Sequence, residues 1–347
     1  KVLGNEYYVM AHRQEPGDGT GSERGSQLLV VAVEDNTQIE VIPSVRADNG
    51  APPNVPILVT LNQGQTYLLQ SEQEDLTGTR IKVVDNGNVC ANVAVFGGNI
   101  FTNVADDANC NPNFGDNERL FAQKFPVSTW GKEFIWVPYE TRLGGDYFKV
   151  TAAEDDTQVD ISGQNSPILL DAGETFTIKA LRNVRRITSN KPVQIAQMSR
   201  STLCDGQNGD PFMIMLSPLE QRVRQATFDA FDAPVISQYY LTLVTETGGG
   251  AGVTLDGVDI SGDFTNGGGG SYASLTINQG THTVVAPQGV IAYVYGYGAN
   301  ESFGYSAGVN LENLNIKIIF KIQRAFMKLR CFTLTEIQPV VAILRPS

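Results

Sequence analysis

Apolar and polar residues alternate along most of this chain with a period of two. The pattern is clear in the segments 80–85, 175–180 and 253–260. This is the period of a half-buried β-strand, and no sustained helical period is found before residue 310. Gly, Asn, Asp and Pro clusters separate the short apolar runs, as is typical of turns between strands. The sequence therefore predicts an all-β fold of sandwiches or barrels.

Part of the alternating pattern occurs more than once in the sequence. The stretch AVEDNTQIEV at 32–41 returns as AAEDDTQVDI at 152–161, and PILVTLNQGQTYLL at 56–69 returns as PILLDAGETFTIKA at 167–180. A more diverged copy begins near residue 225. Self-similarity at a fixed spacing indicates a copied structural unit, and units of this length match a two-sheet sandwich.

We therefore predict three repeated β-sandwich-like units and a short basic C-terminal segment of unassigned structure. The predicted boundaries are 1–122, 123–222 and 223–310 for the three units, and 311–347 for the basic apolar tail. The tail has three competing interpretations. It is an added element docked on the acidic body, the start of a further domain or secretion signal, or the product of an altered reading frame.

The repeated acidic stretches are open to two interpretations, a metal site or a turn. Glu34, Asp35 and Asn36 carry oxygen ligands, but Asp and Asn also adopt turn dihedrals and bond their own backbone. Repetition favours the hairpin. A second repeated pattern is expected to supply positive φ angles in three further hairpins. Its glycines are Gly64, Gly173 and Gly280.

The charge balance excludes one class of partner. The chain has 25 Lys and Arg against 37 Asp and Glu, a net charge of −12. Nucleic-acid binding requires clustered cations, so we expect no nucleic-acid partner. No run of 18 apolar residues is present, and a transmembrane helix is therefore not expected either.

Candidate catalytic residues are few. His12 and His282 are the only histidines, and neither belongs to a recognisable nucleophile motif. We therefore expect a protein that is not an enzyme. A secreted carbohydrate-active enzyme using two carboxylates stays open as an alternative, because carboxylates are abundant in this chain.

Calcium is the one cofactor that the sequence brings into consideration. A polar loop before residue 119 offers several oxygen ligands, although an EF-hand spacing is absent and a solvated loop is the competing interpretation. The candidate ligands are Asp106, Asp107, Asn109, Asp116 and Glu118.

An aromatic and glycine-rich segment near residue 300 is a candidate ligand-contact surface, since exposed aromatics suit sugars and proteins. Aromatics that pack across a sheet and into an interdomain joint are the competing interpretation. The candidate contacts are Tyr293, Tyr295, Tyr297, Phe303 and Tyr305.

Several longer strings resemble a known family. They are PVSTWGKEFI at 126–135, DPFMI at 210–214, SPLEQ at 217–221 and YGYGANESFGYSAG at 295–308. Together they are similar to the N-terminal domain of the IgGFc-binding protein family, over roughly 1–310. The family occurs in animal mucus proteins and in bacterial surface and secreted proteins. The resemblance implies an extracellular, non-enzymatic module for adhesion or surface assembly, and we do not extend antibody binding to this chain.

The resemblance also bears on the cysteines. Relatives carry a cysteine pair around 101–110, whereas here residue 101 is Phe and only Cys110 remains. If Cys110 keeps a partner, the candidates are Cys90 and Cys204.

We expect a protein or glycan ligand at the cell surface, with self-association possible. Besides the carbohydrate-active enzyme, a further alternative is a structural subunit of a filament or appendage.

Overall fold

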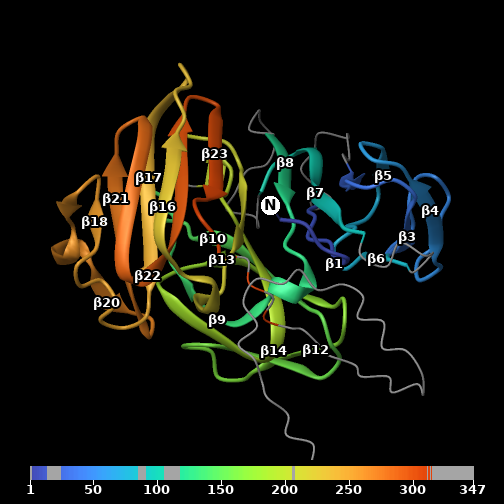
Figure 1. Ribbon diagram of the computed structural model, residues 1–347, viewed down its shortest axis with the longest axis horizontal. Helices are drawn as coiled ribbons and strands as arrows, with labels where there is room; N and C mark the ends of the chain where they lie inside the picture. The colour runs from blue at the N-terminus through green and yellow to red at the C-terminus, as the bar shows by residue number, and fades with distance from the viewer. Residues whose placement is uncertain are drawn as a thin grey trace, which may run out of the picture.

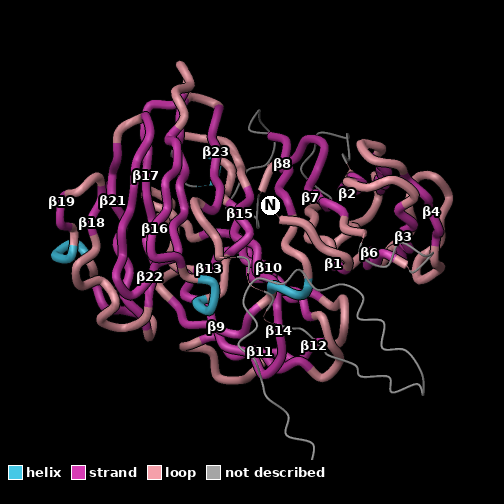
Figure 2. Tube along the Cα trace, viewed as in Figure 1, coloured by secondary structure: helices cyan, strands magenta, loops and turns pink. Residues whose placement is uncertain are grey.

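The computed structural model describes residues 2–13, 25–84, 91–104, 118–204, 208–310, 312 and 314. Within these residues the protein is built from antiparallel strands in four sheets, which confirms the all-β prediction (Figures 1 and 2). The helical turns in this part of the chain are single 3-10 turns: η1 (Val127–Thr129), η2 (Thr202–Cys204), η3 (Leu219–Gln221) and η4 (Ser261–Asp263). No helix among the described residues has the length and hydropathy to cross a bilayer.

The first strand group consists of two four-stranded sheets, in the orders β1-β6-β3-β4 and β5-β2-β7-β8. Alternate residues of β2 and β3 are buried, and the two sheets enclose a core around Val30 and Ile39. The strands are β1 (Glu6–Tyr8), β2 (Ser26–Ala32), β3 (Thr37–Ile42), β4 (Ile57–Leu61), β5 (Thr66–Ser71), β6 (Arg80–Val83), β7 (Val93–Thr102) and β8 (Glu118–Gln123).

The second strand group is one seven-stranded sheet that curls around a long strand, β14 (Arg185–Met198). The first half of β14 pairs with β11 and β9, and its second half pairs with β10 and β15. The other strands are β9 (Gly131–Trp136), β10 (Asp146–Ala152), β11 (Thr157–Ile161), β12 (Ile168–Leu170), β13 (Thr175–Leu181) and β15 (Met213–Leu216).

The third strand group is built in the same way. It is one eight-stranded sheet that curls around the long strand β22 (Gly280–Gly298). β16 and β18 pair with the first part of β22, and β17 and β23 pair with its last part. The other strands are β16 (Val223–Ala230), β17 (Ile236–Thr245), β18 (Thr254–Leu255), β19 (Val258–Asp259), β20 (Thr265–Gly267), β21 (Gly270–Ile277) and β23 (Glu301–Ser306).

The second and third groups are therefore strongly curled single sheets, and only the first group has two separate sheets. The prediction of three repeated sandwich units goes beyond this and stays a prediction. In Figure 1 the first group lies on the right, the third on the left, and the second below and between them.

The first of the two acidic stretches, residues 34–36, forms the turn between β2 and β3 and is called the first acidic corner. Hydrogen bonds from its own residues and from Thr37 hold this turn. The Thr37 hydroxyl donates to the carbonyl oxygen of Glu34 at 2.8 Å, and the Asp35 carboxylate accepts the Gln63 N–H at 3.0 Å. Asn36 has a φ of 54°. The acidic residues thus satisfy backbone groups of the adjoining hairpin.

The second acidic corner, between β10 and β11, reproduces these bonds. The Thr157 hydroxyl donates to the Glu154 carbonyl oxygen at 2.6 Å, the Asp155 carboxylate accepts the Ala172 N–H at 3.0 Å, and Asp156 has a φ of 52°. The two corners therefore occupy equivalent places, as the hairpin interpretation predicts. The glycines of the second repeated pattern also have the expected positive φ: 80° at Gly64, 84° at Gly173 and 118° at Gly280.

Buried contacts join the three groups. Tyr8 and Met10 of the first group pack with Tyr147 and Met198 of the second in one apolar cluster. The tyrosines of β22 pack into the core of the second group. The chain after β23 then returns to the second group, where the Leu314 N–H donates to the Ser128 carbonyl oxygen at 2.8 Å. The remainder of the predicted tail lies outside the described residues.

Candidate functional site

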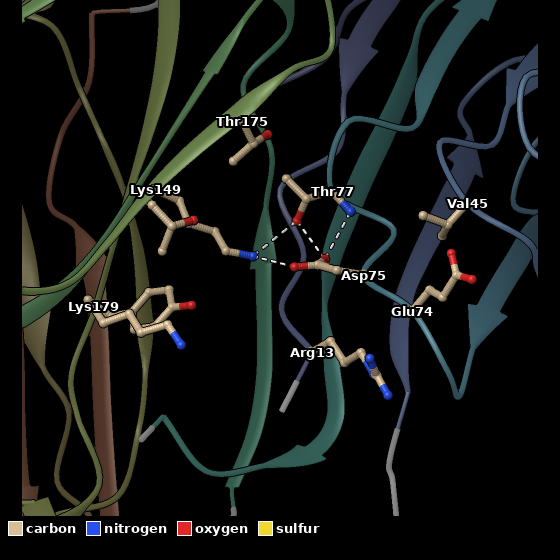
Figure 3. Close-up of a pocket in the computed structure, with 10 residues that line it drawn as sticks. Arg13, Val45, Glu74, Asp75, Thr77, Lys149, Thr175 and Lys179 are labelled. Carbon is tan, nitrogen blue, oxygen red and sulfur yellow. Dashed lines mark hydrogen bonds and ion pairs between the residues drawn. The ribbon is translucent and has the colours of Figure 1, made fainter. Parts of the chain in front are cut away.

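A polar cleft of 450 Å³ lies between the first and second strand groups. One wall is formed by β10 and β13, and the other by the segment before β6 together with the end of the segment that follows β1 (Figure 3). Its lining residues are Arg13, Val45, Glu74, Asp75, Thr77, Tyr147, Lys149, Thr175, Thr177 and Lys179.

An ion pair across the two groups forms the floor of this cleft. The ammonium of Lys149, whose side chain is 4% exposed, bonds the Asp75 carboxylate. It also donates to the Ala11 carbonyl oxygen at 3.0 Å and to the Thr77 hydroxyl at 3.3 Å. Burial raises the pKa of Asp75, but the charge and hydrogen bond of Lys149, with the Thr77 hydroxyl, outweigh it and lower that pKa to about 2. The Asp75 carboxylate therefore stays ionised over the physiological range.

His12 lies near this ion pair and is buried. Its Nε2 is 3.3 Å from the Asn103 carbonyl oxygen, and its ring meets the Tyr147 ring edge-on, with centroids 5.3 Å apart. Burial, followed by the positive charge of Lys149, lowers the pKa of His12 to about 4. The imidazole is therefore neutral at physiological pH, held in place by the joint between the two groups.

Because the His12 imidazole is neutral in the fold, we expect the unfolding free energy of the protein to fall in acid. The folded pKa of about 4 lies below the usual 6.5, so the stabilising contribution is complete above pH 6.5. It is lost as the pH falls towards 4, at a total cost of about 3 kcal/mol in unfolding free energy. Urea unfolding at a series of pH values measures it.

The matched variants are His12→Gln and His282→Gln. We expect His12→Gln to lose stability less steeply than the native chain between pH 6.5 and 4. His282→Gln should not show this flattening, because burial is outweighed by hydrogen bonds, chiefly that with Asp256, which raise the pKa of His282, so that the contribution of its imidazole does not fall with the pH. Equal slopes for His12→Gln and the native chain would contradict the assignment. The carboxyl of Asp75 titrates at lower pH and does not contribute in this window.

Lys124 is a second buried cation near the same joint. It is fully buried, and its ammonium nitrogen lies 3.5 Å from the Met215 sulfur and 3.8 Å from the Met213 sulfur. Burial, with the charge of Lys149 as a smaller cause, holds the pKa of Lys124 well below its usual value. A lysine in such surroundings favours its neutral amine.

The sequence analysis missed the residues of this cleft. Asp75 and Lys149 are far apart in the sequence and belong to different strand groups, so spacing cannot connect them. A signal did exist for Lys124. It follows Leu120 and Ala122 at alternate positions of an inward-facing row, where an apolar residue is expected.

The predicted aromatic contacts lie in the interior. Tyr293, Tyr295 and Tyr297 are at most 5% exposed and form part of the core shared by the second and third groups. The Tyr295 hydroxyl accepts the Glu140 N–H at 2.9 Å, and the guanidinium of Arg142 lies over the Tyr297 ring, 4.6 Å from its centre. These three tyrosines build the joint and present no surface to a ligand.

Phe303 and Tyr305 follow on β23. Phe303 is 9% exposed and Tyr305 is half-buried, and their rings stack with centroids 6.3 Å apart. The Tyr305 hydroxyl donates to the Asp229 carbonyl oxygen at 2.6 Å. Of the five predicted contacts, Tyr305 has the most exposed surface among those that the structure describes.

The calcium prediction falls mostly outside the described residues. Glu118 is the one described candidate; it is half-buried, and its carboxylate accepts the Arg119 N–H at 2.6 Å. The described part of the chain contains no group of three or more His, Cys, Asp or Glu able to hold a metal ion. The candidates outside the described residues are Asp106, Asp107, Asn109 and Asp116.

The disulfide prediction is only partly open to inspection. Cys204 is disulfide-bonded. Cys90 and Cys110 lie outside the described residues, so the pairing stays a prediction.

Of the comparisons with known proteins, one gives a match. No curated protein and no solved structure matches the chain significantly. A family model described as IgGFc binding protein matches residues 1–296, which is most of the 347-residue chain. That match covers the first and second strand groups and the third as far as β22, so β23 lies beyond it. The chain belongs to the IgGFc-binding protein family.

Proposed function

We propose that this protein is an extracellular or cell-surface module for adhesion or surface assembly, without enzymatic activity. It binds a glycan or protein ligand through loops and clefts on a rigid β scaffold. Membership of the IgGFc-binding family supports this proposal, because the family model is described as that of a binding protein.

The observation that carries the proposal is the burial of both joints between the strand groups. At the first joint the Lys149 side chain is 4% exposed and bonds Asp75 of the neighbouring group. At the second, Tyr295 and Tyr297 are completely buried. Buried joints hold the surface loops and the cleft at fixed separations. A binding protein with preorganised contacts loses less conformational entropy when its ligand binds.

Binding of the full chain to extracellular glycoproteins tests this function. Beads coated with the native chain are expected to adhere to at least one surface in a panel of immobilised extracellular glycoproteins and glycans. Beads coated with the same chain after irreversible unfolding should not adhere, because the contacts depend on the scaffold. Failure of the native chain to bind any member of a broad panel would contradict the proposal.

A specific observation also favours self-association, which the assembly part of the proposal requires. Leu58 on β4 is 61% exposed and Leu169 on β12 is 71% exposed. Both strands pair on one side only within the described residues, so each leaves a sheet edge open. An exposed edge with apolar side chains is a surface for pairing with another chain.

Charged residues at these edges should prevent such pairing. We expect the double variant Leu58→Lys/Leu169→Lys to weaken self-association of the native chain by about tenfold, equivalent to about 1.4 kcal/mol. Sedimentation over a concentration series measures it. The control is Leu143→Lys, which changes a leucine that is 83% exposed but lies outside any strand. A native chain that stays monomeric at high concentration would contradict assembly through these edges.

A further inference from the structure

A hollow of 680 Å³ lies on the sheet of the third strand group, over the neighbouring strands β17 and β21 (Figure 1). The antiparallel register of these strands places Tyr240 opposite Thr276. The next pair on the same face, two residues away on each strand, is Gln238 and Asn278, and both line the hollow. Cross-strand neighbours on one face have Cβ atoms about 5 Å apart. The strand register therefore brings four hydrogen-bonding side chains together at one place.

These side chains are available to a ligand. Gln238, Thr276 and Asn278 are exposed, and their side-chain amides and hydroxyl form no hydrogen bond to another residue that the structure describes. Tyr240 is held in place at the side of the hollow, because its ring stacks on the buried ring of Tyr295 with centroids 5.4 Å apart. The hollow thus has polar groups without partners beside a fixed aromatic ring.

The same face of β21 continues into a neighbouring hollow of 560 Å³ at the joint with the second strand group. Tyr272 and Ser274 line that hollow, at alternate positions with Thr276, and Asn278 follows directly after the strand. These four residues form a row about 20 Å long, which we call the β21 row. The Ser274 hydroxyl is buried and has no hydrogen-bond partner among the described residues. Such hydroxyls are rare in folded proteins, and a ligand along the row can supply the missing bond.

The chemistry of the larger hollow indicates an uncharged ligand. Every residue of its lining is uncharged, so nothing there compensates the cost of dehydrating a charged group. Carboxamides and hydroxyls both donate and accept hydrogen bonds, as sugar hydroxyls do. Small-ligand sites combine aromatic side chains with a few placed polar groups in a volume of about 300–1,000 Å³, as is found here.

We propose that the β21 row, with Gln238 and Tyr240 of β17, binds a neutral linear oligosaccharide beside the joint between the second and third strand groups. The side chains of Gln238, Thr276 and Asn278 bond the sugar hydroxyls, and Tyr240 contacts the apolar face of a sugar ring. The length of the row fits a chain of several sugars. This inference rests on the proposed binding function and assigns it a site and a ligand class.

Calorimetric titration of the full chain tests the ligand class. The probes are chitotetraose, cellotetraose, their two monosaccharides, and tetragalacturonate, which carries a carboxylate on every sugar. We expect at least one neutral tetrasaccharide to bind, about tenfold or more tighter than its own monosaccharide, because further sugars add hydrogen bonds along the row. Tetragalacturonate should not bind, since the larger hollow has no cation and the chain has a net charge of −12.

Substitutions in the larger hollow test the site. Gln238→Ala and Asn278→Ala each remove a hydrogen-bonding group and should weaken binding of the neutral tetrasaccharide about fivefold. Thr276→Arg fills the hollow and should abolish binding. The matched controls are Gln63→Ala and Thr66→Arg, which change an exposed glutamine and an exposed threonine outside both hollows and should bind as the native chain does. Thermal unfolding first confirms that each variant is folded.

The outcomes separate this inference from the general binding function. The site assignment is overturned if neither neutral tetrasaccharide binds, if the monosaccharides or tetragalacturonate bind equally well, or if all three variants of the hollow keep the native affinity. If the coated beads still adhere in that case, the adhesive function stands and its contacts lie elsewhere. If a neutral tetrasaccharide binds at this site but the beads adhere to no surface, the site stands and the adhesive function fails.

Discussion

Replacing Asp75 with alanine is expected to lower the unfolding free energy by about 3 kcal/mol. The substitution leaves the Lys149 ammonium, on a side chain that is 4% exposed, with only the neutral oxygens of Ala11 and Thr77 as partners. Removing the partner of a nearly buried ammonium is costly because the remaining charge is left uncompensated. Urea unfolding at pH 7 measures the loss.

Two further variants distinguish the cost of leaving Lys149 without its partner from the cost of losing an ordinary surface ion pair. Glu133→Ala removes the partner of Arg186 in a pair whose side chains are 45% and 33% exposed, and it should cost at most about 1 kcal/mol. The double variant Asp75→Leu/Lys149→Met removes both charges of the pair, of which only Lys149 is nearly buried, and should recover most of the stability lost by Asp75→Ala. A loss of less than 1 kcal/mol for Asp75→Ala would mean that the pair does not hold the joint.

The second large effect has the opposite sign. Lys124→Met is expected to raise the unfolding free energy by about 2 kcal/mol at pH 7. In the unfolded chain the lysine is hydrated and charged, whereas in the fold it lies between Met213 and Met215 with its pKa lowered. Methionine has a similar length and is apolar, so it fills the space without the cost of dehydrating a charge.

The pH dependence identifies the cause of this gain. A lysine with a lowered folded pKa contributes fully above its unfolded pKa, near 10.5, and becomes destabilising as the pH falls below that value. The advantage of Lys124→Met should therefore shrink as the pH rises towards 10. Lys132→Met, at an exposed position on β9, is the control and should change stability little. A variant less stable than the native chain would contradict the assignment.

The acidic corners could be predicted from the sequence because their causes are local. Asp35 and Asn36 adopt turn geometry and bond neighbouring backbone, and the copy at 154–157 repeats the same bonds. Turn chemistry of this kind depends on a few adjacent residues. The positions of these turns and the all-β class can therefore be predicted from the sequence.

The curling of the sheets could not be predicted in the same way. Alternation indicates a strand, but it does not show that β14 and β22 continue through both halves of a sheet. The aromatic and glycine-rich sequence of β22 predicts an exposed contact surface. The structure shows another reason for its glycines: a Cβ at Gly298 would lie 1.8 Å from the Val235 carbonyl oxygen, and one at Gly296 would lie 2.6 Å from the Phe303 ring. These glycines permit close packing against neighbouring strands.

The candidate site depends on contacts between distant segments. Arg13, Asp75 and Lys179 line one cleft only because the first and second strand groups dock on each other. Arginine, aspartate and lysine are common residue types, and no short motif distinguishes these three. A binding site at a joint of this kind becomes visible only when the relative position of the two groups is known.

Scanning calorimetry of the full chain tests most directly whether the three strand groups form one rigid scaffold. Buried joints predict one cooperative transition whose van't Hoff and calorimetric enthalpies agree, and the Asp75→Ala substitution should move that whole transition to lower temperature. Separate transitions for the first group and for the rest, with only one of them moved by Asp75→Ala, would contradict the account. In that case the cleft would have no fixed walls.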